Sequence, residues 1–279
     1  MAARTGVMLA TKATDKILST WPNCIICQPK LNGMRCRTNE EGQMFSSQGT
    51  PISCLPHITE ELQKIAFDKC FDGELYSHGM SLQKILSITK RKEIHPNCKK
   101  VKYRIFDYIK GDLSQHYRIN CIDVLLTGAE SCIELVPSKD ILQSEIPSML
   151  EEYLSLGYEG IILRNPRAFY EPKRSKNLLK IKPEFFGNFK IIGYMPEVSQ
   201  SGNDKDTLGS LIVESSSGET FSVGGGKLDQ VQRKLLWNKK SKLKGLFAKI
   251  RYCYLTERGV PNPPILISIL NKDLSTYME

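Results

Sequence analysis

The chain has 279 residues, of which 41% are hydrophobic and 25% charged, so it reads as a globular protein rather than a disordered, collagen-like or coiled-coil chain. Lysine and arginine outnumber aspartate and glutamate by 39 to 30, and the resulting charge of +9 favours a polyanionic partner. No apolar run reaches the ~20 residues of a membrane helix, and residues 1–22 contain no apolar signal core. The nine cysteines, an odd number, predict reduced thiols in a protein that is not secreted.

Helix and strand signals alternate over the first two thirds of the chain. An apolar run at 24–27 predicts a strand, and β-rich runs at 71–76 and 103–109 predict two more. Residues 147–156 predict a helix, with a proline in the first turn and a glycine after the last. A strand at 160–164 follows at once. This part of the chain is typical of a mixed α+β domain.

The sequence changes character near residue 187. Four short strands are predicted, at 189–195, 209–214, 220–223 and 246–255. Between the third and fourth, leucine and valine side chains at helical spacing from Leu228 to Leu236 predict one amphipathic helix. Short strands plus one helix in about 90 residues fit a small OB-fold β-barrel. We therefore expect an α+β protein with one domain at 1–186 and an OB-fold domain at 187–279.

Two motifs in the first domain carry groups suited to phosphate chemistry. In Lys30-Leu-Asn-Gly-Met-Arg35, a lysine at a strand end precedes a glycine turn and an arginine, which suits a nucleophile beside an anion. In Phe71-Asp-Gly-Glu-Leu-Tyr76, Asp72 and Glu74 alternate along a strand and so share a face that suits a metal ion or a ribose hydroxyl. Alone, the lysine motif is a weak signal that also fits an exposed turn, and the carboxylate motif is better explained by an ordinary Asp-Gly turn.

Three further motifs follow along the chain. Phe106 lies in a strand, where an aromatic ring either stacks on a base or packs in the core. Glu159 begins the apolar strand that ends at Arg164, and is either exposed or a metal ligand. Lys180 and Lys182 alternate with apolar residues, so their like charges share a face and repel unless an anion lies between them.

Taken together, these motifs are far more informative than any one of them. Lys30, Glu74, Glu159 and Lys180 follow one another at gaps of 44, 85 and 21 residues. In order and spacing the chain resembles the covalent nucleotidyltransferases, and among them the ATP-dependent DNA ligases. The resemblance continues through 208–214, 221–226, 233–237 and 254–261, which look like a ligase OB domain. It covers most of the chain and is greatest to the minimal two-domain ligases of viruses and bacteria.

The resemblance implies a role for each motif residue. Lys30 would attack the α-phosphate of ATP and carry AMP, which would then pass to the 5′-phosphate of a nick before the 3′-hydroxyl attacks. Gln28 and Phe106 match the adenine contacts, and Arg35 matches a contact to ribose or nick phosphate. The remaining ATP-binding residues are Glu74, Lys180 and Lys182, and the metal-binding carboxylates are Glu74, Glu159 and Asp72.

The resemblance also implies the partners. These are ATP, Mg²⁺ or Mn²⁺, and nicked duplex DNA bound by a monomer without a membrane, in bacterial or virus-infected cytoplasm or in a nucleus. Replication, repair and recombination are all compatible pathways. The predicted DNA-binding residues, several of them in basic clusters, are Arg35, Arg164, Arg233, Lys234, Lys239 and Lys240. Only 197–207 separates two matching OB strands, so no long DNA-closing hairpin is expected.

Four positions depart from the ligase pattern. Asn32 stands where aspartate is usual, and Ser47, Asn262 and Leu270 stand where arginines are usual. The last two fall in the motif that orients pyrophosphate, so adenylylation is expected to be slow unless Lys249, Arg251 or Lys272 substitutes. Two alternatives stay open: an RNA ligase or capping-type guanylyltransferase, which shares the lysine chemistry, and a degenerate ligase that binds nicks without activating ATP.

Overall fold

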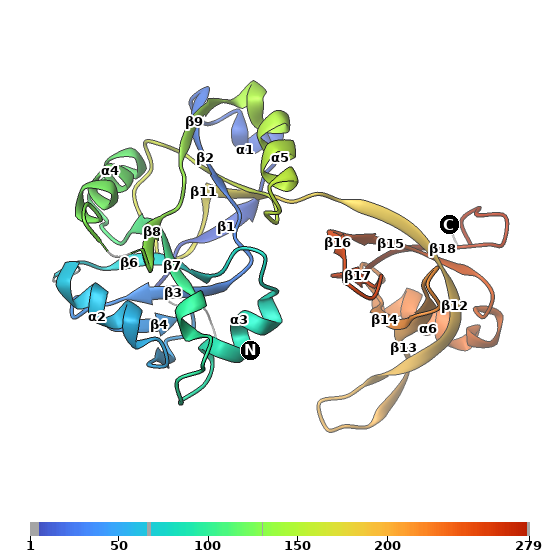
Figure 1. Ribbon diagram of the computed structural model, residues 1–279. Coiled ribbons are helices and arrows are strands. Elements are labelled where there is room, and N and C mark those ends of the chain that lie inside the picture. The colour runs from blue at the N-terminus through green and yellow to red at the C-terminus, as the bar shows by residue number, and fades with distance from the viewer. Residues whose placement is uncertain (1–5, 66–67, 130, 278–279) are drawn as a thin grey trace. The chain divides into compact units, whose positions relative to one another are not determined.

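The structure is a computed structural model, and it describes residues 6–65, 68–129 and 131–277. Residues 1–5, part of the stretch inspected for a secretory signal, lie outside this description. The chain divides into two compact units, Met1–Lys182 and Pro183–Glu279, so the division lies four residues before the predicted boundary (Figure 1). Each unit has its own hydrophobic core.

The first unit is built on two sheets (Figure 1). The first sheet runs in the order β1 (Leu9–Lys12), β11 (Arg174–Ile181), β10 (Ile161–Arg164), β2 (Cys24–Pro29) and β9 (Lys139–Leu142). The second runs in the order β5 (Pro51–Ile52), β4 (Met44–Ser46), β3 (Met34–Thr38), β6 (Phe71–Tyr76), β7 (Lys102–Tyr108) and β8 (Ile133–Leu135). Neighbouring strands are antiparallel except for the pairs β1–β11 and β7–β8.

Helices cover the apolar faces of these sheets. They are α1 (Asp15–Leu18), α2 (Pro56–Ile65), α3 (Leu82–Thr89), α4 (Gln115–Leu125) and α5 (Ile146–Ser155), with 3₁₀ turns at Cys98–Lys100 and Gln143–Glu145. Met149 and Tyr153 of α5 pack with Ile25 and Ile161 of the first sheet. Ile58 of α2 belongs to the core of the second sheet. Across residues 6–65, 68–129 and 131–277, no helix is both long and apolar enough to cross a membrane.

The predicted elements of the first unit are confirmed. The strands expected at 24–27, 71–76, 103–109 and 160–164 are β2, β6, β7 and β10, and the helix expected at 147–156 is α5. These were predictable because apolar periodicity and a proline-to-glycine frame are local signals.

The second unit is a five-stranded sheet with one helix. The strand order is β14 (Thr220–Gly224), β13 (Asp204–Glu214), β12 (Phe185–Val198), β15 (Phe247–Tyr252) and β18 (Ile265–Leu270), with a small ladder of β16 (Tyr254–Leu255) and β17 (Pro261–Asn262). Helix α6 (Gln230–Asn238) starts at a capping box of Asp229 and Gln232, precedes a 3₁₀ turn at Lys240–Lys242, and packs Leu236 into the core. The predicted α+β class is confirmed, although the sheet forms an open ladder.

The hairpin between β12 and β13 is longer than the sequence predicted. The strands were expected to end at residue 195 and to resume at 209, with a turn-rich segment between them. Instead they stay paired out to Val198 and Asp204, and Lys205 Nζ donates to Glu197 Oε1 at 2.8 Å. Polar residues form such a ribbon because cross-strand charge pairs replace the missing apolar face.

Candidate active site

A cavity of about 1210 Å³ opens in the first unit, lined by strands of both sheets. Its charged lining comprises two carboxylates, Glu74 and Glu159, and nine cations: Lys30, Arg35, Lys90, Arg91, Lys92, Arg164, Arg174, Lys180 and Lys182. Such an excess of fixed positive charge in a concave site attracts a polyanion and raises its local concentration.

Lys30 lies where two strands of the first sheet are tied together. It follows β2 directly, and its backbone N–H donates to Gly160 O at 2.8 Å, while Glu159 N–H donates to Lys30 O at 3.1 Å. Gly160 has φ = +147°, and a Cβ there would lie 2.2 Å from Ile181 O. Only glycine fits, so the Glu-Gly pair fixes the carboxylate beside the lysine.

Gly33 explains the spacing of the lysine motif. A Cβ at this position would lie 2.3 Å from Leu75 O and 2.8 Å from Glu74 Cγ. Without one, the turn after Lys30 rests directly on β6, and Gly33 N–H donates to Glu74 Oε1 at 3.1 Å. The glycine therefore brings the lysine motif and the carboxylate motif into one site.

Glu159 lies between two lysines. Lys30 Nζ donates to Glu159 Oε2 at 2.5 Å, and Lys182 Nζ pairs with Oε1. Burial opposes ionisation of Glu159, but the two lysines outweigh it and hold the pKa of this carboxyl below its usual value. Burial, together with the charges of Lys182 and Lys30, lowers the pKa of Lys180. Three lysines against one carboxylate leave a net positive charge suited to a phosphate group.

The pKa of Glu74 is shifted in the opposite direction to that of Glu159. Burial raises the pKa of this carboxyl, and the nearby charges of Arg35 and Lys30 oppose the rise without cancelling it. A buried carboxylate that is costly to ionise gains when a cation lies beside it.

Asp72 lies beneath the cavity and does not line it. Its side chain is buried, and Arg35 clamps it through Nε to Oδ1 at 2.6 Å and Nη2 to Oδ2 at 2.5 Å. The Tyr170 hydroxyl also donates to Oδ2 at 2.6 Å. The predicted metal contact of Asp72 does not fit this arrangement, because its side chain is only 1% exposed and lies outside the cavity lining. The clamp holds the Arg35 guanidinium 4.6 Å from the Phe106 ring centre.

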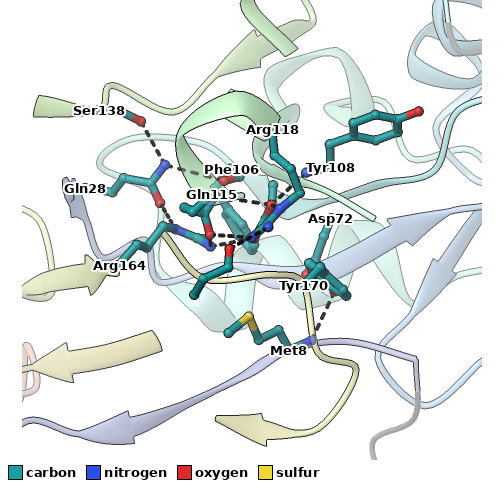
Figure 2. Close-up of polar contacts among 12 residues, drawn as sticks. Met8, Gln28, Asp72, Phe106, Tyr108, Gln115, Arg118, Ser138, Arg164 and Tyr170 are labelled. Carbon is teal, nitrogen blue, oxygen red and sulfur yellow. Dashed lines mark hydrogen bonds and ion pairs between the residues drawn. The ribbon is translucent and has the colours of Figure 1, made fainter. Parts of the chain in front are cut away.

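Arg164 is also buried, with 2% of its side chain exposed. It donates through Nε to Gln28 Oε1 at 2.6 Å and through Nη1 to Asp107 Oδ2 at 2.6 Å. Arg118 Nε donates to the other oxygen of Asp107 at 2.7 Å. Its Nε and Nη1 donors are therefore used inside the unit, which gives Arg164 a structural role (Figure 2). The predicted DNA contact of Arg164 stays a prediction.

The basic residues predicted on the second unit differ in availability. Lys234 and Lys239 are exposed on and just after α6. Lys240 lies with its Nζ 4.2 Å from the Trp237 ring centre, a cation–π contact. Arg233 is only partly exposed and donates through Nε to Leu228 O at 3.2 Å. Lys234 and Lys239 are thus the freest of the four to meet a phosphate backbone.

The four departures from the ligase pattern fall in different places. Asn32 and Ser47 line the cavity. Asn262 Nδ2 donates to the Tyr254 hydroxyl at 2.7 Å, across the small β16–β17 ladder. Leu270 is 7% exposed and packs in the core of the second unit. Position 270 therefore serves packing here, where a charged side chain would be costly.

The three residues expected to substitute for the missing arginines also lie in the second unit. Arg251 pairs with Glu184 at 3.3 Å, and Lys249 Nζ lies 5.8 Å from the Phe186 ring centre. Lys272 is exposed. Their proposed part in adenylylation stays a prediction.

Several residues of the site network were missed by sequence reasoning. Asp107 directly follows Phe106 in the aromatic motif, and Gln115 and Arg118 share a face of α4 at i, i+3 spacing. That spacing was a usable signal. Tyr170 and Ser138 gave none, because they reach the site from segments without regular structure in the sequence pattern.

The first unit matches a known family. A family model for the ATP-dependent DNA ligase domain matches residues 7–182. The chain belongs to the ATP-dependent DNA ligase family. A DNA ligase of Haemophilus influenzae is 26% identical over 228 residues, which cover 80% of this chain and 79% of that protein. The predicted family and enzyme class are confirmed.

Solved structures support the whole architecture. A structure from a structure–function analysis of Lig E DNA ligases, at 20% identity, matches with a TM-score of 0.80 and covers 95% of this chain and 98% of its own. A Chlorella virus DNA ligase–adenylate, at 25% identity, matches with a TM-score of 0.54 over 96% of this chain and 98% of its own. The family fold therefore extends through both units, including the predicted OB-fold.

Proposed function

We propose that the chain, acting as a monomer, seals nicks in duplex DNA through a lysyl-AMP intermediate on Lys30. The observation that carries this proposal is the position of Lys30 Nζ, held by Glu159 in a cavity with Lys180 and Lys182. All of these groups come from one unit of one chain. The membership of the ligase family supplies the use of ATP.

The first step is an in-line displacement at phosphorus. Lys30 Nζ attacks the α-phosphorus of ATP, the N–P bond forms, and the bond to the bridging oxygen of pyrophosphate breaks. A protonated amine cannot attack, so the Lys30 amine must give up a proton before the N–P bond forms. We infer that the pair opens as ATP enters, and that Lys180 and Lys182 then hold the phosphates.

The next two steps use the same groups. AMP passes from Lys30 to the 5′-phosphate of the nick, and the 3′-hydroxyl then displaces AMP as the phosphodiester bond forms. In each displacement, charge grows on the phosphoryl oxygens, where preplaced cations stabilise it. Lys234 and Lys239 of the second unit would bind the DNA backbone, which carries no sequence information.

Two carboxylates fit the divalent ion that this chemistry requires. Glu74 and Glu159 both line the cavity, and Mg²⁺ usually takes one or two carboxylates together with substrate phosphates. Among the residues that the structure describes, no three histidine, cysteine, aspartate or glutamate side chains gather into a larger metal cluster. When bound, Mg²⁺ or Mn²⁺ would neutralise phosphate charge.

The mass of the intact protein after incubation with ATP and Mg²⁺ tests the proposal. We expect one added AMP on the wild type and on Lys84→Ala, whose lysine is exposed and outside the cavity lining, but none on Lys30→Ala. Parallel sealing of nicked DNA and nicked RNA then separates a DNA ligase from an RNA ligase. If no AMP is added but a pre-adenylylated nick is sealed, only the first step is lost. If neither occurs, the proposal is wrong, and the alternative of a protein that binds nicks without activating ATP is favoured.

A further inference from the structure

The side-chain amide of Gln28 is held at both ends. Gln28 lies on β2, lines the cavity and is 1% exposed. Its Oε1 accepts from Arg164 Nε at 2.6 Å, while its Nε2 donates to Ser138 Oγ at 2.8 Å and to Phe106 O at 3.4 Å. Figure 2 shows these partners on opposite sides of the amide.

Chemistry fixes which end of the amide is which. A guanidinium has only donors, so the atom facing Arg164 must be the oxygen. The Ser138 hydroxyl donates to Val136 O at 3.1 Å and must therefore accept from Gln28. Each group in the series from Arg164 through Gln28 and Ser138 to Val136 therefore donates to the next one. If the amide were flipped, Gln28 Nε2 would face the Arg164 donor and Oε1 would face the Phe106 carbonyl oxygen.

Arg164 is itself immobilised. Asp107 and Gln115 accept from its Nη1 at 2.6 Å and 3.0 Å, and Arg118 contacts the same two acceptors. Both arginines and Asp107 are at most 2% exposed. Planar guanidinium groups in such a network have little freedom to re-orient. The buried partners of Arg164 therefore determine which end of the Gln28 amide faces it.

We propose that Ser138, Arg164 and Asp107 are positioning residues that make Gln28 select the base of the nucleotide. Arg164 uses one of the two lone pairs of Oε1, which leaves the other for a donor. A purine with a 6-amino group supplies that donor, whereas a 6-keto purine sets an oxygen against an oxygen. The proposal rests on the proposed function, which seats the base of ATP beside Gln28 and Phe106.

The test compares ATP with inosine triphosphate, which carries a 6-keto group and lacks the guanine 2-amino group. Equilibrium binding and AMP or IMP addition to Lys30 are measured for wild type, Ser138→Ala and Ser138→Thr. Losing one neutral hydrogen bond should cut the ATP-over-ITP preference by about three- to tenfold in Ser138→Ala. Ser138→Thr keeps the hydroxyl and should restore the preference.

Two further readouts separate positioning from general damage. Inorganic tripolyphosphate carries no base, so Ser138→Ala should bind it as tightly as the wild type does. Gln28→Leu should abolish the base preference, and adding Ser138→Ala to it should change nothing more, because the serine acts only through Gln28.

An unchanged ATP-over-ITP ratio in Ser138→Ala overturns the proposal, as does a loss that is equal for both nucleotides. The proposed function fails separately. If ATP binds with the expected preference but no protein variant gains AMP, the base selection stands and the ligase chemistry does not.

Discussion

Two charge clusters in the first unit contain the same numbers of positive and negative charges but differ in exposure and in the type of cation. In each, one carboxylate lies between two cations: Glu159 between Lys30 and Lys182, and Asp107 between Arg118 and Arg164. The lysine cluster is 11–28% exposed and opens into the cavity, whereas the arginine cluster is at most 2% exposed.

The choice of cation explains the difference in function. A lysine is a flexible point charge that can lose its proton, so a lysine pair can open and become a nucleophile. Arginine keeps its charge and presents a rigid set of donors, which suits a permanent buried network. We therefore expect the lysine cluster to take part in the chemistry and the arginine cluster to hold the geometry around it.

Replacing lysine by arginine within the lysine cluster tests this difference most directly. Lys30→Arg keeps a positive charge beside Glu159 but cannot supply a neutral nitrogen, so AMP addition should fall by at least about 10³-fold. Its melting temperature should stay near that of the wild type. Lys182→Arg is the matched control and should lose no more than about tenfold, because it only has to stay charged. Comparable losses in both variants would contradict the assignment of Lys30 as nucleophile.

Removing the carboxylate of the arginine cluster should act on stability. Asp107→Asn leaves two buried guanidiniums without a counter-charge, at a cost of about 3–5 kcal/mol in the free energy of unfolding. Glu134→Gln is a matched control, since Glu134 lies between Lys102 and Arg104 at a partly exposed site. There the loss should be about 1 kcal/mol or less. Denaturant titration of both variants measures the difference, and equal losses would show that burial is not the decisive factor.

Glu74→Gln should raise stability at neutral pH while impairing AMP addition. Because burial raises the pKa of Glu74 in the folded chain, its contribution to stability is complete below its unfolded pKa, about 4.3, and is lost as pH rises through the folded value. Glutamine can still accept from Gly33. Thermal melts should therefore show a stabilised variant at pH 7–8 that converges with the wild type near pH 4. A difference that is constant with pH would point to packing instead of titration.

The smallest effects are expected on the second unit. Replacing both Lys234 and Lys239 by alanine should weaken nick binding and reduce the slope of log affinity against log salt by about 2, roughly one for each phosphate contact. Arg233→Ala should change that slope less, because its guanidinium already bonds to Leu228 O. Fluorescence anisotropy with nicked duplex at several salt concentrations measures both. A larger slope change in Arg233→Ala would reverse the order of these residues.

The sequence by itself predicted several of the elements and the protein family. Apolar periodicity located β2, β6, β7, β10 and α5, because that signal is contained in a few neighbouring residues. The order of lysine, carboxylate and aromatic motifs indicated the ligase family before any contact was known. Four strands of the second unit were also predicted, but β18 and the small β16–β17 ladder were missed. The β12–β13 hairpin was predicted too short because its pairing depends on cross-strand contacts.

Only the tertiary structure decided which charged groups are free to act. Asp72 and Arg164 carry the right chemistry in the right motifs, yet partners 37 and 57 positions away in the sequence hold them inside the unit. Glu159 and Lys30 are 129 positions apart and become one site because Gly160 lets two strands meet. Burial and pairing set the availability of a charge, and both depend on which distant segments pack together.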